Sequence, residues 1–488
     1  MPENELAYLF IDDAMIHHLD GVAQGVAPAV KVGSEPILTA DQPWEKDYQV
    51  GSYINVIHDE EDGLFKIWYG VGRRLSDQRG EEADGLAYAF SEDGLHWEKP
   101  VLDLVEDGGS THNNLVFPFF RWGAGHGVFK DPIEHDPARR YKMLFMLQSA
   151  SMAFAGICQP VCVAYSADGV RWNVPPGWLN PVIPKGTDTQ LVAYWDPAIH
   201  RYVVFLRGRP NVRLICMSES DDFESWSDRR IIVAPDELDP PQDHEFYGMS
   251  SMPYRDLRVG FLSIFHTLNE GWIAQNQIEP WMPDWMNQMD VQLTYTLDGR
   301  NWHRAGNREP ILVCGDQGAF DSGAVYPPNA PFMKDGEVWM YYGGSNDLHG
   351  EPPRHGEPVQ RGINLAKIAR DRLVCLKTDG QGVATTTTLG VNADALWINA
   401  DASEGSVRVE LVDPFDRVIE GRSSEDCVPV TGDHLRQRIE WKGGASSESG
   451  AEMAGLESKM VSQSKGGCRM RLFIDRAKVF ALYTELQG

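Results

Sequence analysis

The chain of 488 residues is poor in cysteine, in basic residues and in long hydrophobic runs, and each shortage excludes a class of protein. Its 7 cysteines are scattered and odd in number, which argues against a disulfide framework. Lys and Arg number 44 against 71 Asp and Glu, and the resulting net charge of −27 disfavours nucleic acid and anionic membranes as partners. No apolar run approaches the roughly 18 residues of a membrane helix.

The N-terminal residues carry neither a basic region nor a long apolar stretch, so the sequence as written predicts a cytoplasmic protein. If a signal peptide has been removed, we expect a secreted or periplasmic protein instead. The sequence predicts no oligomeric state.

Turn-forming residues, in contrast, are abundant, and one turn motif recurs. It reads Ser/Thr-x-Asp-Gly-x-x-Trp at residues 91–97, 166–172 and 296–302, with a looser copy at 220–226. Asp-Gly supplies the positive φ and the side-chain-to-backbone hydrogen bonds of a tight turn, and the Trp can cover the turn with apolar surface. We call these four segments the Trp turns.

Five hairpins accompany the Trp turns between roughly residues 45 and 375, each pairing a strand with an aromatic-rich second strand. With almost no amphipathic helical pattern between them, this spacing predicts an all-β fold, a five-bladed β-propeller around a central channel. The alternative is a β-sandwich in which Asp-Gly turns recur by coincidence. We assign residues 1–378 to the propeller, with a strand segment at 1–40 packing on it, and residues 379–488 to a small C-terminal β-sandwich.

At this point the sequence resembles the furanosidase-type glycoside hydrolases of families 32, 43 and 68, which have five blades followed by a sandwich. The runs YAFSEDGLHWEKP, EFYGMSSMPY, FDSGAVYP and MYYGGSNDLHG are similar to bacterial proteins labelled "glycosyl hydrolase family 32 N-terminal domain". The resemblance implies an enzyme that cleaves O-glycosyl bonds. The Trp-Met-Asn-Asp-Pro nucleophile motif of family 32 is absent. The Arg-Asp-Pro motif is matched only weakly, by Lys130-Asp131-Pro132, and we expect Asp131 to close a turn there.

Since the family motifs identify no catalytic residue in this sequence, we choose candidate catalytic residues by position. They should lie at the start of each blade, nearest the propeller axis. Glycoside hydrolysis uses two carboxyl groups that flank the scissile bond. We predict Glu245 as general acid and Asp188 or Asp321 as base or nucleophile. The alternative is that Asp188 caps a turn, that Asp321 binds neighbouring amides, and that Glu45 lies on the surface.

Further polar and aromatic residues are predicted to bind substrate around the same channel. Arg207 follows a strand and can hold an anionic substituent or orient a carboxylate, although a solvated surface arginine is the equal alternative. Trp281, in the long 267–289 connection, can stack on a sugar or merely anchor its loop. The predicted binding residues are Glu45, Asp47, His126, Arg207, Tyr247, His266, Trp281 and His349. No metal-ligand spacing is present and no cofactor is predicted, although a structural Ca²⁺ on the propeller axis is compatible with the acids.

The leading hypothesis is an exo-acting glycoside hydrolase that removes a terminal sugar from a small oligosaccharide or glycoside. One alternative is a propeller that binds carbohydrate without catalysis. Another is a glycoside phosphorylase, for which Arg207 and Arg209 are the candidate phosphate ligands. Carboxyl groups about 5–10 Å apart across an open pocket would favour hydrolysis, and carboxyl groups paired with arginine would favour binding.

Overall fold

The computed structural model describes residues 5–45, 49–74, 82–121, 124–147, 160–175, 181–184, 189–208, 212–267, 287–349, 353, 356–392, 395–442 and 467–485. In these ranges the regular structure is β-strand apart from four 3-10 turns, which confirms the all-β prediction. The chain forms two compact units, one of residues 29–303 and 310–367 and one of residues 1–28, 304–309 and 368–488.

The larger unit begins with three antiparallel four-stranded sheets, each made of consecutive strands. The first contains β5 (Gln49–Asp59), β6 (Leu64–Arg74), β7 (Glu82–Ser91) and β8 (Leu115–Arg121). The second contains β9 (Ala124–Lys130), β10 (Tyr141–Met146), β11 (Val161–Ser166) and β12 (Trp172–Asn173). The third contains β13 (Val192–Asp196), β14 (Arg201–Gly208), β15 (Leu214–Ser220) and β16 (Arg230–Val233).

Two further groups of strands complete the unit, joined by one parallel pair between Met289 and Ala324. The fourth group contains β17 (Glu245–Tyr254), β18 (Leu257–Phe265), β19 (Met289–Thr296) and β21 (Pro310–Leu312), and the short β20 (His303–Arg304) precedes β21. The fifth contains β22 (Ala324–Tyr326), β23 (Phe332–Lys334), β24 (Glu337–Ser345) and β25 (Arg361–Ala369). Its outermost strand, β4 (Val30–Lys31), comes from the N-terminal part of the chain and pairs with β25.

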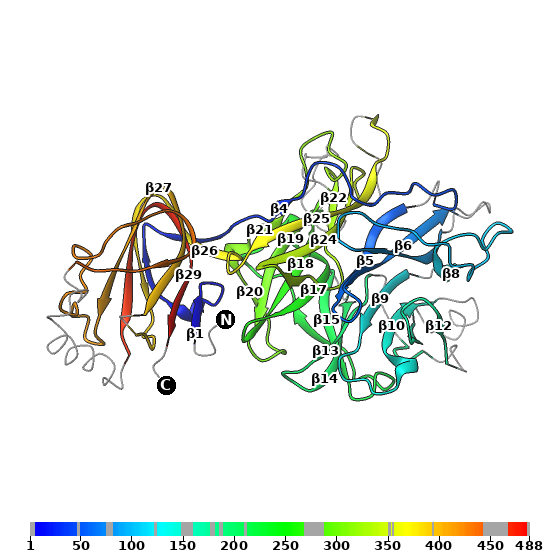
Figure 1. The fold of residues 1–488 in the computed structure, drawn as a ribbon, viewed down its shortest axis with the longest axis horizontal. Coiled ribbons are helices and arrows are strands. Elements are labelled where there is room, and N and C mark those ends of the chain that lie inside the picture. Colours follow the sequence, from blue (N-terminus) through cyan, green and yellow to red (C-terminus); the bar gives the residue numbers. More distant parts are fainter. Residues whose placement is uncertain are drawn as a thin grey trace. The chain divides into compact units, whose positions relative to one another are not determined.

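The innermost strands of the five groups form a ring (Figure 1). Strand β5 contacts β9, β9 contacts β13, and β13 contacts β17. The fifth group closes the circle, because its β22 and β24 contact β5 and its β22 also contacts β19, the third strand of the fourth group. This arrangement is that of a β-propeller, and the five groups fit the predicted number of blades. The start of every innermost strand therefore lies at one end of the ring.

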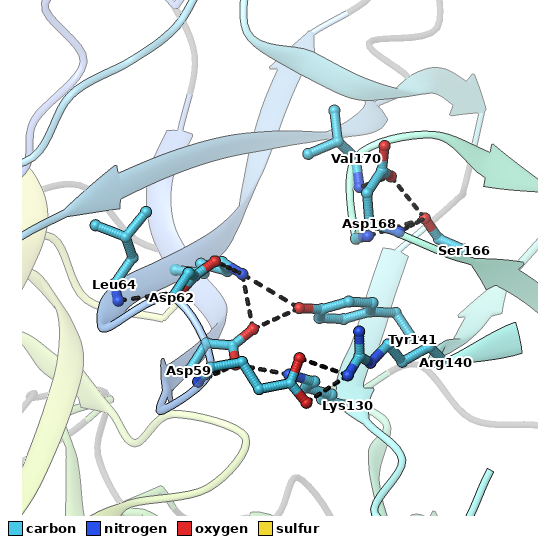
Figure 2. Close-up of polar contacts among 12 residues, drawn as sticks. Asp59, Asp62, Leu64, Lys130, Arg140, Tyr141, Ser166, Asp168 and Val170 are labelled. Carbon is cyan, nitrogen blue, oxygen red and sulfur yellow. Dashed lines mark hydrogen bonds and ion pairs between the residues drawn. The ribbon is translucent and has the colours of Figure 1, made fainter. Parts of the chain in front are cut away.

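The Trp turns have the structure that their sequence predicts. In all four, the Asp side chain accepts the backbone N–H groups two and three positions further on at 2.7–2.8 Å. The residue after each Asp has a positive φ: 77° at Gly94, 77° at Gly169, 68° at Phe223 and 71° at Gly299. Figure 2 shows the second turn, in which the Ser166 hydroxyl also bonds to Asp168.

Buried aspartates at the opposite end of the innermost strands tie neighbouring sheets together. Asp59 of β5 accepts Lys66 at 2.7 Å, and from the second sheet it accepts Lys130 at 2.6 Å and the Tyr141 hydroxyl at 2.8 Å (Figure 2). Asp131 repeats the device, accepting the Tyr202 hydroxyl of the third sheet at 2.7 Å. It also caps the backbone of Ile133, as a turn-closing residue should. These contacts connect one blade to the next through aspartates that are themselves buried.

The smaller unit is a sheet of seven strands, and it corrects one prediction. Its strands are β1 (Glu5–Leu9), β2 (Ile16–Asp20), β3 (Ala23–Val26), β26 (Val374–Thr386), β27 (Leu396–Val412), β28 (Val430–Arg438) and β29 (Arg469–Glu485). The segment 1–40 was predicted to pack on the propeller, and residues 29–40 do so through β4 and Leu38. The first 28 residues do not, because β1 pairs with β29, and β2 and β3 pair with β26. Strand alternation predicts that a segment pairs, not which sheet it joins.

The boundary between the two units was predicted at residue 378, but the larger unit already ends at Lys367. Residue 378 lies inside strand β26 of the smaller unit. The predicted sandwich takes the form of one hydrogen-bonded sheet whose longest strands contain bulges, at Asp401–Ser406 and at Thr378–Gln381. Bulges bend strands, so that a single sheet can enclose its own apolar core.

Candidate functional site

Three tyrosines from the innermost strands of the first, fourth and fifth groups meet at one end of the ring. The Tyr53 hydroxyl lies 3.1 Å from the Tyr247 hydroxyl. The Tyr326 ring centroid lies 6.5 Å from that of Tyr53 and 6.0 Å from that of Tyr247. Tyr247 is buried, whereas Tyr53 and Tyr326 are partly exposed. We call these three residues the tyrosine cluster.

The backbone of the cluster is strained at one position. Tyr53 has a φ of 61°, in the left-handed region that bulky residues avoid, and the register of β5 against β6 shifts between Val50 and Ile54. Such strain costs on the order of 1–3 kcal/mol and persists where the surroundings impose it, often at functional sites. The bulge re-aims the Tyr53 side chain relative to the regular strand.

Aromatic and cationic groups pack around the cluster. The rings of Phe265 and His349 each lie edge-on to Tyr247, with centroids 6.2 Å and 4.9 Å from its own. Arg207 places its guanidinium 4.1 Å from the Tyr247 ring centroid and donates to the Tyr247 carbonyl at 2.7 Å and 3.0 Å. Arg207 therefore holds Tyr247 in place, a role distinct from the solvated arginine considered above.

Burial keeps the phenols of the cluster protonated. It raises the pKa of Tyr53 well above its usual value, and the nearby Tyr247 adds to the effect. Burial likewise raises the pKa of Tyr326. Both hydroxyls therefore stay neutral at any physiological pH and can both donate and accept a hydrogen bond.

Glu245 stands at the start of β17, two residues before Tyr247, and is buried. Its Oε2 accepts the Arg213 guanidinium at 2.8 Å and the Arg213 backbone N–H at 3.1 Å. No described residue donates to its Oε1. Arg213 also lies over Phe265, 5.3 Å from its centroid, and so connects Glu245 to the surroundings of the cluster.

His266, at the end of β18, is held between two carboxylates. Its Nδ1 lies 2.7 Å from Asp243 Oδ1 and its Nε2 lies 3.0 Å from Asp290 Oδ2. Burial alone would lower the pKa of this imidazole, but the hydrogen bonds to Asp243 and Asp290 outweigh it and raise the pKa to about 10. With both ring nitrogens occupied, His266 acts as a fixed cation that ties three segments together.

Two other predicted acids are engaged in ion pairs of their own. Asp321 accepts Lys31 of β4 at 2.6 Å and the Tyr342 hydroxyl at 2.8 Å. Glu45 is fully buried, with one oxygen bonded to the Tyr69 hydroxyl at 2.6 Å and the other to Lys99 at 2.6 Å. Both acids are thus structural, Glu45 being buried rather than on the surface and Asp321 pairing with Lys31 rather than with amides, and neither acid is assigned to the site.

His126, on β9, is buried between aromatic rings. Its ring stacks on Phe145 with centroids 6.5 Å apart and meets Phe117 edge-on at 5.8 Å. Burial lowers its pKa to about 4, so His126 is neutral near pH 7. These contacts make it part of the core between the first and second sheets.

Three of the predicted site residues, Asp47, Asp188 and Trp281, lie outside the described residues, as does Arg209. In the described part of the chain, no group of His, Cys, Asp and Glu side chains is arranged to hold a metal ion. Within the same ranges, no helix has the length and apolar character needed to cross a membrane.

Sequence reasoning missed Tyr53, Tyr326 and Arg213. The search favoured carboxylates, whereas the groups that converge here are mostly phenols. A signal was nonetheless present, because Tyr53, Tyr247 and Tyr326 each lie within five residues of the start of the first strand of their units. An alignment of the five units by the start of their first strands, rather than by their acidic residues, would have predicted that the three tyrosines lie close together.

No protein-family model matches the sequence. Two uncharacterized proteins of Mycobacterium tuberculosis, from strains H37Rv and CDC 1551, are each 25% identical over 174 residues, covering 36% of this chain and 50% of theirs. The chain thus spans about half the length of the curated relatives it matches.

Similar solved structures include an N-acetylgalactosamine deacetylase from F. plautii in complex with blood group B trisaccharide, at 16% identity and a TM-score of 0.44, covering 72% of this chain and 95% of that chain. A glycosyl hydrolase from Bacteroides ovatus has 12% identity and a TM-score of 0.45, with 73% and 98% covered. A β-1,2-mannobiose phosphorylase from Listeria innocua has 11% identity and a TM-score of 0.45, with 70% and 97% covered. At these scores the likeness decides nothing, and the fold and site rest on the strands and side chains described above.

Proposed function

We propose that the protein is a sugar-processing enzyme that removes a terminal sugar from a small oligosaccharide or glycoside at the tyrosine cluster. The observation that carries the proposal is the convergence of Tyr53, Tyr247 and Tyr326 from three innermost strands, beside the buried Glu245. Aromatic rings with a few fixed polar groups are the usual lining of a small-molecule site.

The chemistry of the cluster suits a neutral sugar. A sugar ring presents C–H faces that pack on aromatic rings, and its hydroxyls need partners that both donate and accept. The partly exposed phenols of Tyr53 and Tyr326 supply both properties, and their raised pKa values keep them neutral. A site at one end of a closed ring suits the end of a sugar chain better than its interior.

For the chemical step, Glu245 is the carboxyl group that we propose to act on the glycosidic bond. Its Oε2 is fixed by Arg213, and its Oε1 is the oxygen that can face a substrate. A second carboxyl group is required, and Asp188, from the sequence pattern, is the candidate. Asp321 is not proposed for this role because Lys31 and Tyr342 already engage its carboxylate.

A second candidate function, carbohydrate binding without catalysis, is favoured by one contact. Glu245 is paired with Arg213, the arrangement that a binding site would show. In that case Glu245 and the phenols recognise hydroxyl groups, and no bond is cleaved.

The test is a screen of aryl glycosides and natural oligosaccharides for hydrolysis and, by calorimetry, for binding. For a hydrolase, Glu245→Gln and Asp188→Asn lower kcat by about 10²-fold or more while binding survives. Tyr326→Ala weakens binding by about tenfold or more, and Asp321→Asn is the matched acidic control with unchanged binding. Binding without turnover supports the second candidate, and unchanged turnover in all variants removes the site.

A further inference from the structure

A separate cavity of about 500 Å³ lies between the outermost strand of the first sheet and the Trp turn of the second. Its lining comes from β8, from the connection before it with Leu104 and Val105, from Phe145 of β10, and from the second Trp turn and Val174 after it. The lining includes Val116, Phe117 and Trp172. None of the tyrosine cluster contributes to it. A volume in this range is sufficient for a small organic ligand.

In the other three Trp turns, the Trp ring pairs with another aromatic ring. In the first turn Trp97 packs on Tyr341, with centroids 5.7 Å apart, and in the fourth Trp302 packs on Phe205 at 5.5 Å. In the third, Trp226 packs on Phe223 at 5.5 Å. Trp172 packs instead against the core that contains Phe117 and Phe145, and with these two rings it lines the cavity. A cavity walled by aromatic rings favours an aromatic ligand.

The charged side chain in the lining indicates the charge of the ligand. Among the described residues that line it, Arg171 is the one charged residue and none carries a carboxylate. Arg171 pairs with Asp168 at 3.0 Å through NH1, and its side chain remains 70% exposed. A guanidinium has five N–H donors, arranged so that two of them can bind one carboxylate. Arg171 therefore keeps N–H donors for a ligand carboxylate besides the one that it gives to Asp168.

From these observations we infer that the cavity is a second ligand site, which takes a planar aromatic carboxylate of one or two rings. The aromatic ring stacks on Trp172 against the apolar wall of Val116 and Phe117. The carboxylate points to Arg171 at the rim. This site is independent of the proposed sugar chemistry, because it uses other strands and other side chains.

The test is calorimetric titration of the full-length protein with 2-naphthoate, alongside 2-naphthamide and cyclohexanecarboxylate. We expect saturable one-site binding of 2-naphthoate, with the neutral amide and the non-planar acid each weaker by about fivefold or more. Arg171→Gln should weaken 2-naphthoate by about fivefold to tenfold and leave 2-naphthamide unchanged, as expected for one exposed charged contact.

His96→Gln is the matched control, because His96 holds the same place in the first Trp turn and bonds Asp93 as Arg171 bonds Asp168, outside the cavity. Filling the cavity with Val174→Trp or, from the opposite wall, Leu104→Trp should abolish binding of both naphthyl compounds. Two filling variants are used so that misfolding of one, seen by circular dichroism, leaves the other. Binding that survives either folded variant, equal binding of the cyclohexane acid, or no saturable binding overturns the inference.

Discussion

At the scale of single residues, the molecule uses buried charge mainly for architecture. Asp59 illustrates this: burial opposes its ionisation, but hydrogen bonds from Lys130, Lys66 and Tyr141 outweigh burial and hold its pKa well below the usual range. Removing one partner of such a group leaves a buried charge uncompensated, which is costly. An acidic residue near the axis is therefore not by itself evidence for catalysis here.

His266 gives a prediction with a defined pH dependence. Its folded pKa of about 10 lies above the usual 6.5, so the stabilisation is fully present below about pH 6.5 and is lost as pH rises through 10. We expect His266→Gln to lower the free energy of unfolding by about 2–3 kcal/mol at pH 6 and by much less at pH 10.5. Urea unfolding at both pH values measures it, with exposed His96→Gln as control. A pH-independent difference would contradict the assigned charge.

The sequence predicts where some residues lie near the axis, but not the roles of the acidic residues there. Glu245 and Tyr247 could be predicted because they begin a strand beside the axis. The structural roles of Asp321 and Glu45 could not, because their partners Lys31 and Lys99 are distant from them in sequence. Nothing in the sequence alone distinguishes an acid that faces a channel from one that faces a lysine.

At the scale of elements, the Trp turn is the unit that the sequence specifies best. Its hydrogen bonds are local, so residue identity at fixed spacing determines them, and all four copies form as predicted. Strand pairing across long stretches is less determined, which is why the partner sheet of the first 28 residues was wrongly predicted. The turn also fits a neighbour, since Trp68 of the first sheet donates to the Gly169 carbonyl at 2.6 Å.

Two glycines separate backbone strain from packing at this element. Gly169 and Gly63 have nearly equal φ values of 77° and 74°. A Cβ at Gly169 would come within 2.6 Å of Trp68, whereas a Cβ at Gly63 would meet nothing within 4 Å. We expect Gly63→Ala to cost about 1 kcal/mol of stability and Gly169→Ala about 2–4 kcal/mol. Thermal and urea unfolding measure both, and equal losses would show that the turn does not pack on the preceding blade as described.

At the scale of the whole larger unit, ring closure depends on a strand from early in the chain. Strand β4 completes the fifth group, and its Lys31 pairs with the buried Asp321. The sequence predicted five blades, but the closure by residues 30 and 31 has too short a pattern to be recognised in advance.

The Lys31–Asp321 pair is tested by a double-mutant cycle. We expect Lys31→Met alone to destabilise the larger unit by about 2–4 kcal/mol, because it leaves the Asp321 carboxylate without its cation. The double variant with Asp321→Asn should recover part of that loss. Lys334→Met is the control, because Lys334 is about as exposed as Lys31 but its 3.5 Å contact is to the exposed Asp335, so that we expect a change below about 1 kcal/mol. Strictly additive losses would mean that the pair does not fasten the ring.

The central claim is that a sugar binds at the tyrosine cluster, and a crystal structure of the protein with the tightest oligosaccharide from the screen tests it most directly. The account predicts the terminal sugar packed on the rings of Tyr53 and Tyr326, with a hydroxyl or the glycosidic oxygen within hydrogen-bond reach of Glu245 Oε1. A sugar bound only elsewhere on the larger unit, or on the smaller unit, would contradict it.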